Sequence, residues 1–243
     1  MYLLKDVDIL VVSCGGCSTT MLINFLRENG IRTNDPSDLD GLKHARFPPL
    51  SIGNGCKVVY VFCDPVEALG SLYRRHYQCR QFSKLSGNYF AVPPELENIQ
   101  KLADSSSGDL FQMRNHFTTW LDKWQVYETL AIRFDAIWEE KLLLYDFAGI
   151  RNPEVPLPDR RSRKSSLDEE TRRKLSVIHK GWWSSYNRPV RILPQNGLSV
   201  QLLYKIFWLM FVVSDLIKRS IAKLLFGHSR GPAYLRPGEP DDF

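Results

Sequence analysis

Residues 7–22 read Val7-Asp8-Ile9-Leu10-Val11-Val12-Ser13-Cys14-Gly15-Gly16-Cys17-Ser18-Thr19-Thr20-Met21-Leu22. A short apolar run rich in β-branched residues ends at two glycines, and a segment with the apolar spacing of a helix follows over 21–29. The stretch therefore predicts a strand, a tight loop and a helix. The first amides of a helix have no partner inside it, and glycines let an anion approach the backbone, so this loop predicts a phosphate-like ligand. It lacks the Gly-Lys-Ser/Thr of an NTPase P-loop, which argues against an ATP or GTP hydrolase.

Length and composition predict a single globular domain with a C-terminal extension. The chain has 243 residues, of which 44% are hydrophobic and 24% charged. That is enough to bury one substantial core, which we assign to residues 1–196. An apolar and basic helical extension is expected over 197–230, and a disordered tail over 231–243. The net charge of +5 is mild and both signs are mixed along the chain, which favours small anionic ligands or a membrane surface over nucleic acid.

The start of the chain and its cysteines bear on location and metal binding. The first strand begins near residue 7, which leaves no room for a secretion signal, so we expect a cytoplasmic protein. Five cysteines are an odd number in a long chain, which favours reduced thiols over a disulfide framework. The one Cys-x-x-Cys pair has no matching second pair and the histidines are scattered, so no metal site is expected.

The order of the remaining segments predicts an α/β fold. Residues 57–62 form a continuous apolar run typical of a buried parallel strand, and Pro65 then opens a helix expected over 66–77. Residues 78–109 are expected to be a loop-rich lid or insertion. Beyond it we expect a helix over 110–128, a strand over 129–134, and helices over 139–147 and 167–180. The fold class is therefore α/β, with three layers, a mainly parallel central sheet and helices on both faces.

Three blocks in this order resemble the sulfotransferases that use 3′-phosphoadenosine 5′-phosphosulfate (PAPS). Residues 16–22 are similar to the family's Lys-Ser-Gly-Thr-Thr-Trp-Leu loop, which holds the 5′-phosphosulfate. Residues 57–65, followed by Ser71, resemble the strand, the Arg-Asp/Asn-Pro turn and the downstream serine that bind the 3′-phosphate. Trp124 and residues 130–137 resemble the strand that ends in Arg-Tyr-Glu-Asp-Leu. The resemblance covers residues 7–180 in outline and implies a P-loop NTPase-like sulfotransferase fold.

The resemblance also implies an activity and a donor site. The expected reaction moves a sulfuryl group from PAPS to a hydroxyl or amine of an unidentified acceptor, which is a carbohydrate, a lipid or a small molecule. The residues expected to bind the donor are Gly15, Gly16, Cys17, Ser18, Thr19, Thr20, Ser71, Arg161, Arg163 and Lys164. Helix capping by Ser18-Thr19-Thr20, a packing contact at Ser71 and a solvated basic loop over 160–166 are the alternative interpretations.

Leu42-Lys43-His44 looks like the segment that carries the family's catalytic Lys-Thr-His, displaced by one residue. His44 would take the proton from the acceptor as sulfur is attacked, a role that suits an imidazole. Lys43 would supply positive charge beside it. The alternative is that His44 is an ordinary surface histidine.

Two positions depart from the family pattern. The loop lysine falls on Gly16, and the arginine that pairs with the 3′-phosphate falls on Cys63. A missing fixed charge opposite a transferring group removes several kcal/mol of transition-state stabilisation. Either Lys43, Arg74, Arg75 or the basic loop of the 160s replaces these charges, or the chain is a catalytically degenerate binding protein at a membrane surface.

Two further alternatives concern the thiols and the C-terminal helix. Cys14 and Cys17 at a strand-to-helix junction also fit a thioredoxin- or glutaredoxin-like redox motif. The run 200–226 is apolar but contains several basic residues. It predicts either a helix in a membrane interface, with Trp208 and Phe211 toward the lipid, or a helix packed on the core or in a dimer interface. The segments 78–117 and 182–186 are expected to shape the acceptor pocket.

Overall fold

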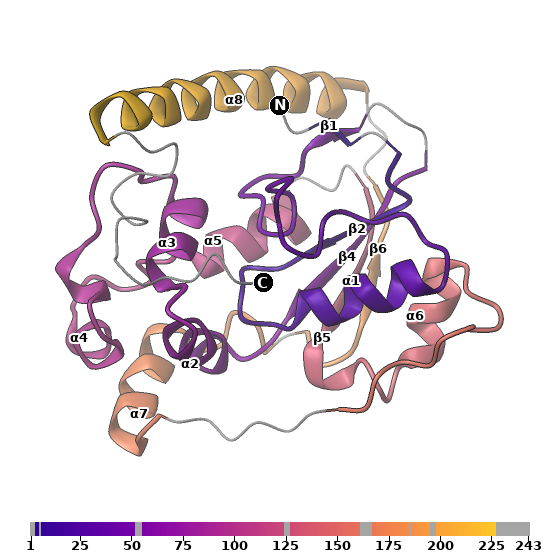
Figure 1. Cartoon of the computed structure of the whole chain (residues 1–243), viewed down its shortest axis with the longest axis horizontal. Helices are drawn as coiled ribbons and strands as arrows, with labels where there is room; N and C mark the ends of the chain where they lie inside the picture. Colours follow the sequence, from indigo (N-terminus) through magenta and orange to yellow (C-terminus); the bar gives the residue numbers. More distant parts are fainter. Residues whose placement is uncertain are drawn as a thin grey trace.

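The computed structural model of the chain is built around a four-stranded open sheet (Figure 1). It describes residues 3–4, 6–51, 55–123, 127–160, 167–184, 186–194 and 198–226. The sheet contains β2 (Ile9–Val12), β4 (Lys57–Phe62), β5 (Glu128–Arg133) and β6 (Val190–Ile192), in that order. The first three strands are parallel and β6 is antiparallel to β5. A separate parallel pair joins β1 (Leu3–Leu4) to β3 (Leu50–Ser51).

The apolar runs form strands because both faces of the sheet are covered. Along β2, Ile9 and Val11 belong to one core cluster, and Leu10 and Val12 belong to the other. Alternate residues of a strand point to opposite faces, so a strand buried on both faces is apolar throughout. The predicted strands at 7–12 and 57–62 are confirmed. The short edge strand β6 was not predicted.

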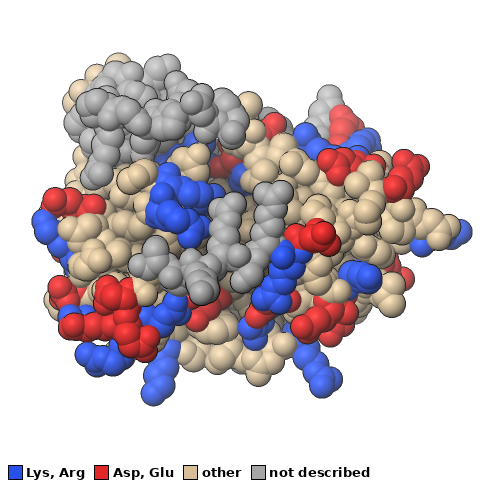
Figure 2. Space-filling model, turned by 60° about the horizontal axis from the view of Figure 1, so that its bottom comes forward, with Lys and Arg blue, Asp and Glu red and all other residues tan. Residues whose placement is uncertain are grey.

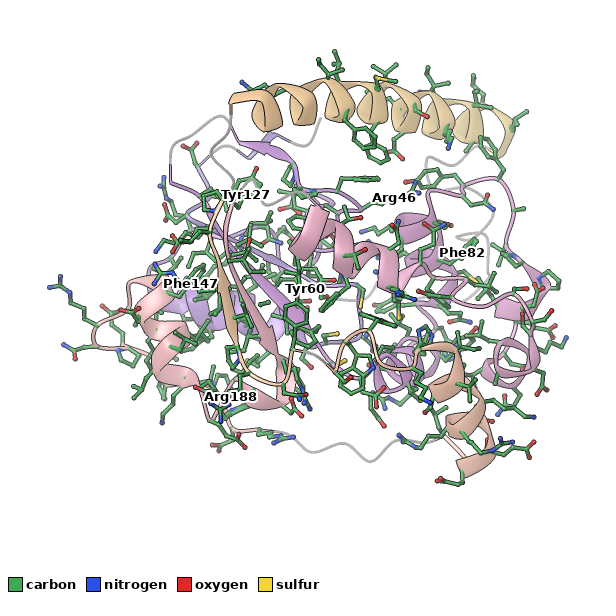
Figure 3. All side chains as sticks on the ribbon, turned by 180° about the vertical axis from the view of Figure 1, so that it is seen from behind. Arg46, Tyr60, Phe82, Tyr127, Phe147 and Arg188 are labelled. Carbon is green, nitrogen blue, oxygen red and sulfur yellow. The ribbon has the colours of Figure 1, made fainter. Side chains whose placement is uncertain are left out.

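Helices cover both faces of the sheet, so the expected coarse α/β layering is confirmed. One core cluster contains residues of α1 (Thr19–Glu28), α2 (Pro65–Arg74), α6 (Lys141–Ala148) and α7 (Glu169–Ile178). The other contains α5 (Met113–Thr118) and the π-helical turn Thr119–Lys123, whose aromatic side chains pack around Tyr60 (Figure 3).

The expectation of a loop-rich lid over 78–109 is wrong. This segment contains α3 (Gln78–Ser86), the 3₁₀ turn η1 (Pro94–Leu96) and α4 (Ile99–Asp104). Phe82, Leu85 and Leu102 are buried in the core. The cause is the helical spacing of a few apolar side chains in otherwise polar segments, which buries one face of each helix. The helix expected over 66–77 ends at Arg74, and His76 beyond it has φ +58°.

A long C-terminal helix, α8 (Leu198–Phe226), runs along one side of the molecule (Figure 1). The rings of Phe211 and Phe47 lie 4.0 Å apart, so the expected orientation of Phe211 toward a membrane is wrong. The side chain of Trp208 lies outside the described part of the chain, as do residues 227–243. None of the described helices combines the length and the apolar character needed to cross a bilayer.

Candidate functional site

The loop between β2 and α1 is packed tightly against two helices. Gly15 and Gly16 have φ values of +101° and +77°. A Cβ atom on Gly16 would lie 2.6 Å from the carbonyl oxygen of Ala68 in α2. Gln81 of α3 donates its Nε2 hydrogen to the carbonyl of Cys14 at 2.7 Å. Position 16 therefore has no room for the lysine that the family carries there, because any side chain would meet the backbone of α2.

The first turn of α1 presents its amides without a side-chain cap. Ser18 precedes the helix in the left-handed conformation, at φ +53°, and its side chain makes no capping hydrogen bond. Thr19 is buried, whereas Thr20 is exposed. The first amides of an uncapped helix have no partner inside the helix, which is an arrangement that binds anions. This geometry disfavours the alternative in which Ser18 simply caps the helix.

A cavity of about 730 Å³ opens beside this turn. It lies between α1 along its length, helix α2, the end of β5 and the segment 158–160. Of the residues predicted to bind the donor, it brings together Gly16, Ser18 and Ser71. Cys63, at the position of the family's arginine, also lines it. Figure 2 shows Lys and Arg side chains at several places on one face of the molecule, interspersed with Asp and Glu.

Four arginines line the cavity: Arg74, Arg75, Arg133 and Arg160. Arg75 donates its Nε hydrogen to the carbonyl of Ser71 at 3.1 Å, which holds it beside that residue. The Nε atom of Arg133 is buried without a hydrogen-bond partner, and its guanidinium carbon lies 5.6 Å from the ring centre of Trp183.

Several acidic residues also line the cavity, and three of them have partners. The carboxylate of Asp64 accepts the amide of Val66 at 2.9 Å and so caps α2. Glu67 pairs with Arg172 at 2.7 Å, and Asp135 pairs with Arg133. These contacts reduce the repulsion that an anion would meet, because each carboxylate already interacts with a donor.

Lys43 contacts the first turn of α1 from the segment that precedes β3. Its Nζ donates to Thr20 Oγ1 at 3.0 Å and to the carbonyl of Pro36 at 2.5 Å. Burial, followed by the positive charges of Arg75 and Arg80, lowers the pKa of this amine to about 8. Neither Lys43 nor Thr20 lines the cavity, but the charge of the cavity residue Arg75 acts on Lys43.

His44 is held in one tautomer at the end of β2. Its Nδ1 lies 2.9 Å from the carbonyl oxygen of Ser13. Because a carbonyl can only accept, Nδ1 carries the hydrogen, and Nε2 keeps a lone pair that can take a proton. Burial, followed by the charge of Lys43, holds the pKa of His44 well below its usual range. The imidazole is therefore neutral at physiological pH.

The thiols do not form an accessible redox pair. Cys14 and Cys17 are both buried, and the Sγ of Cys17 lies 3.1 Å from that of Cys63. Hydrogen bonds to Cys14 and Cys63, together with burial, raise the pKa of Cys17 well above its usual value. A thioredoxin-like motif needs an exposed thiol with a lowered pKa, so the geometry disfavours this alternative. Among the described residues, no group of three potential ligands could hold a metal ion.

Some predicted residues cannot be placed, and others were missed. Arg161, Arg163, Lys164 and Trp124 lie outside the described residues. Arg133 was not predicted as a site residue, and Arg160 was predicted only as part of the basic loop over 160–166, yet both line the cavity. A signal existed for Arg133, because it ends a predicted strand and the carboxyl ends of parallel strands share one edge of the sheet. No family model, curated protein or solved structure matches the chain.

Proposed function

We propose that this chain is a PAPS-dependent sulfotransferase that acts in the cytoplasm on a hydroxyl or amine acceptor. The observation that carries the proposal is the uncapped first turn of α1, which lies beside a cavity with Ser71 and four arginines and carries the Lys43 amine on Thr20. A helix N-terminus with several positive groups near it suits a ligand with more than one anionic group.

The residues present fit such a donor. The Ser71 hydroxyl and the guanidiniums of Arg74 and Arg75 would hold the 3′-phosphate, since all three line the cavity. The amides at Ser18 and Thr19 would hold the phosphosulfate end, because the first turn lacks a side-chain cap. The bound donor would supply an activated sulfuryl group whose bond to a phosphate oxygen breaks during transfer.

Lys43 and His44 would carry the chemical step. The ammonium of Lys43, held against Thr20, would neutralise the charge that develops at the first turn of α1. It would therefore supply the positive charge of the family's loop lysine, for which position 16 has no room. The Nε2 of His44 would accept the acceptor's proton, because Nδ1 is committed to the Ser13 carbonyl.

Calorimetric binding of 3′-phosphoadenosine 5′-phosphate, the expected product, tests the donor site. We expect the folded chain to bind it more tightly than adenosine 5′-monophosphate, which lacks the 3′-phosphate. The Ser71→Ala/Arg74→Ala variant should bind 3′-phosphoadenosine 5′-phosphate at least about tenfold more weakly than the wild type. Its affinity for adenosine 5′-monophosphate should be nearly unchanged. The matched control is Ser106→Ala/Arg114→Ala, which alters an exposed serine and an exposed arginine that do not line the cavity.

A folded wild-type chain that binds neither nucleotide would refute the proposal. Equal binding of the two nucleotides would refute the assignment of Ser71 and Arg74 to a 3′-phosphate.

A second candidate is a binding protein of the same fold without transferase activity. Gly16 cannot accommodate the family's lysine, and Cys63 carries no fixed positive charge. This candidate predicts product binding without consumption of PAPS in the presence of a broad set of acceptors. Detection of sulfuryl transfer to any acceptor, abolished by Lys43→Met, would exclude it.

A further inference from the structure

Helix α8 presents an apolar face away from the body of the protein. This outer face consists of Ile206, Met210, Val213, Ile217, Ile221 and Leu224, whose exposed fractions range from 42% to 85%. Their spacing of three or four residues places them on one side of the helix. Several of the described side chains of α8 project away from the fold (Figure 3). An apolar surface of this extent marks an interaction site.

The opposite face fixes the rotation of α8 about its axis. Phe211 packs on Phe47, and the guanidinium carbon of Arg46 lies 5.7 Å from the Phe211 ring centre. Ala222 is fully buried. Tyr89 donates its hydroxyl hydrogen to the carboxylate of Asp215 at 3.1 Å. These contacts explain why the outer face stays exposed, since the remaining side of the helix already packs on the body.

Charge is distributed unequally between the two faces. Asp215 is the only acidic residue between Leu198 and Phe226, and it is buried against Tyr89. Lys205 and Lys218 are exposed and flank the outer face on its two sides. The accessible surface of α8 is therefore apolar and basic, with no accessible carboxylate among its described side chains.

We infer that the outer face of α8 docks the protein on an anionic phospholipid surface. The apolar side chains would enter the boundary between headgroups and acyl chains, and Lys205 and Lys218 would lie at the level of the anionic headgroups. The helix would lie flat, because α8 is not apolar enough to cross a bilayer. The inference does not depend on sulfuryl transfer.

Charge complementarity favours this occupant over a second copy of the chain. A dimer through the outer face would bring the lysines of two helices together, and α8 offers no exposed carboxylate to pair with them. An anionic bilayer instead supplies a counter-charge for each lysine, worth about 1 kcal/mol per basic residue near the surface.

The test is co-sedimentation of the full-length chain with two kinds of vesicle, phosphatidylcholine alone and phosphatidylcholine with phosphatidylserine. We expect binding to the anionic vesicles, at least about tenfold weaker binding to the neutral ones, and a loss of binding as salt is raised. The Met210→Asp/Ile217→Asp variant should lose binding to both. Leu142→Asp/Val177→Asp is the matched control. These residues lie outside α8 and are 74% and 69% exposed, so the variant should bind vesicles as the wild type does.

A charge variant separates the electrostatic contribution to vesicle binding from the apolar contribution. Lys205→Glu/Lys218→Glu leaves the apolar face intact and should remove the preference for anionic vesicles. A folded wild-type chain that ignores both vesicles would overturn the inference, as would equal binding to both. Light scattering that shows a dimer, dissociated by Met210→Asp/Ile217→Asp, would reassign the outer face to self-association and would also overturn it. Nucleotide binding is unaffected by either result, so failure here is distinguishable from failure of the transferase proposal.

Discussion

The thiols of Cys17 and Cys63 lie 3.1 Å apart, although 46 residues separate them in the sequence. Cys17 is the last residue before the left-handed Ser18, and Cys63 directly follows β4. The contact thus joins the loop before α1 to the position at which the sulfotransferases that the sequence resembles carry an arginine. Two adjacent strand ends meet at the carboxyl edge of a parallel sheet, which brings the two thiols together.

This contact predicts which disulfide forms on oxidation. Treatment with hydrogen peroxide, which is reduced to water as two thiols are oxidised, should link Cys17 to Cys63. The reaction should accelerate as pH rises, because the pKa of Cys17 is raised and the thiolate is the reactive form. Peptide mapping of a non-reduced digest would identify the bond. Cys14→Ser should retain the link and Cys63→Ser should lose it. A Cys14–Cys17 bond with Cys63 free would instead favour the redox alternative.

We expect Gly16 not to tolerate a side chain because of the clash with α2. Gly30 provides a control that separates this clash from the cost of the backbone conformation. Gly16 and Gly30 have similar φ values, +77° and +79°, but a Cβ on Gly30 would meet nothing within 4 Å. Both Gly→Ala variants carry the cost of the left-handed conformation, and only Gly16→Ala adds a clash with Ala68. We expect Gly16→Ala to lose about 1–3 kcal/mol more unfolding free energy than Gly30→Ala in urea denaturation. Equal losses would mean that the loop moves freely away from α2.

The central strands and the loop glycines were predictable because their signals are local. A continuous apolar run over 57–62 gives a buried strand, and two adjacent glycines before a helix give a tight loop. The edge strand β6 has only three residues and exists through its pairing with 129–131 of β5. Such a strand has no periodicity of its own to detect.

The contact between Lys43 and Thr20 could not be predicted from their sequence separation. The path of the chain over 34–44 depends on turns in which side chains of Asp35, Asp38 and Asp40 accept backbone amides. Asn34 adds two hydrogen bonds to Val11 and so anchors this segment beside β2. Each of these hydrogen bonds is local, but together they determine the position of Lys43. No single sequence motif predicts that position.

His116 should make the protein sensitive to acid. Its Nε2–H donates to the carbonyl of Ala45 at 3.0 Å, so its Nδ1 accepts the hydroxyl of Tyr60 at 2.8 Å. Burial lowers the pKa of His116 to about 3, below the ordinary 6.5 of an unfolded chain. A group with a depressed pKa in the fold stabilises it fully above about 6.5, and stability is lost as pH falls toward 3.

From this residue alone, we expect a loss of about 2 kcal/mol of unfolding free energy between about pH 7 and pH 5. His116→Gln keeps one donor and one acceptor but does not titrate in this range. It should therefore lose less stability over the same interval in denaturant titrations at each pH. If the unfolding free energy of the variant falls with pH as steeply as that of the wild type, other groups cause the acid sensitivity. His44 is the first candidate, because its pKa is also depressed.

Lys43 should make anion binding depend on pH in the mildly alkaline range. With a pKa of about 8, the amine is charged below that value and neutral above it. Affinity for 3′-phosphoadenosine 5′-phosphate should therefore fall as pH rises through 8, because the cation beside Thr20 is lost. Lys43→Met should bind at least about tenfold more weakly near neutral pH and show no such fall. Lys43→Arg should retain the charge throughout, and the exposed Lys141→Met should behave as wild type. If Lys43→Met preserves both the affinity and its pH profile, the amine only ties the segment around Pro36 to α1, and the missing loop lysine has no replacement at this position.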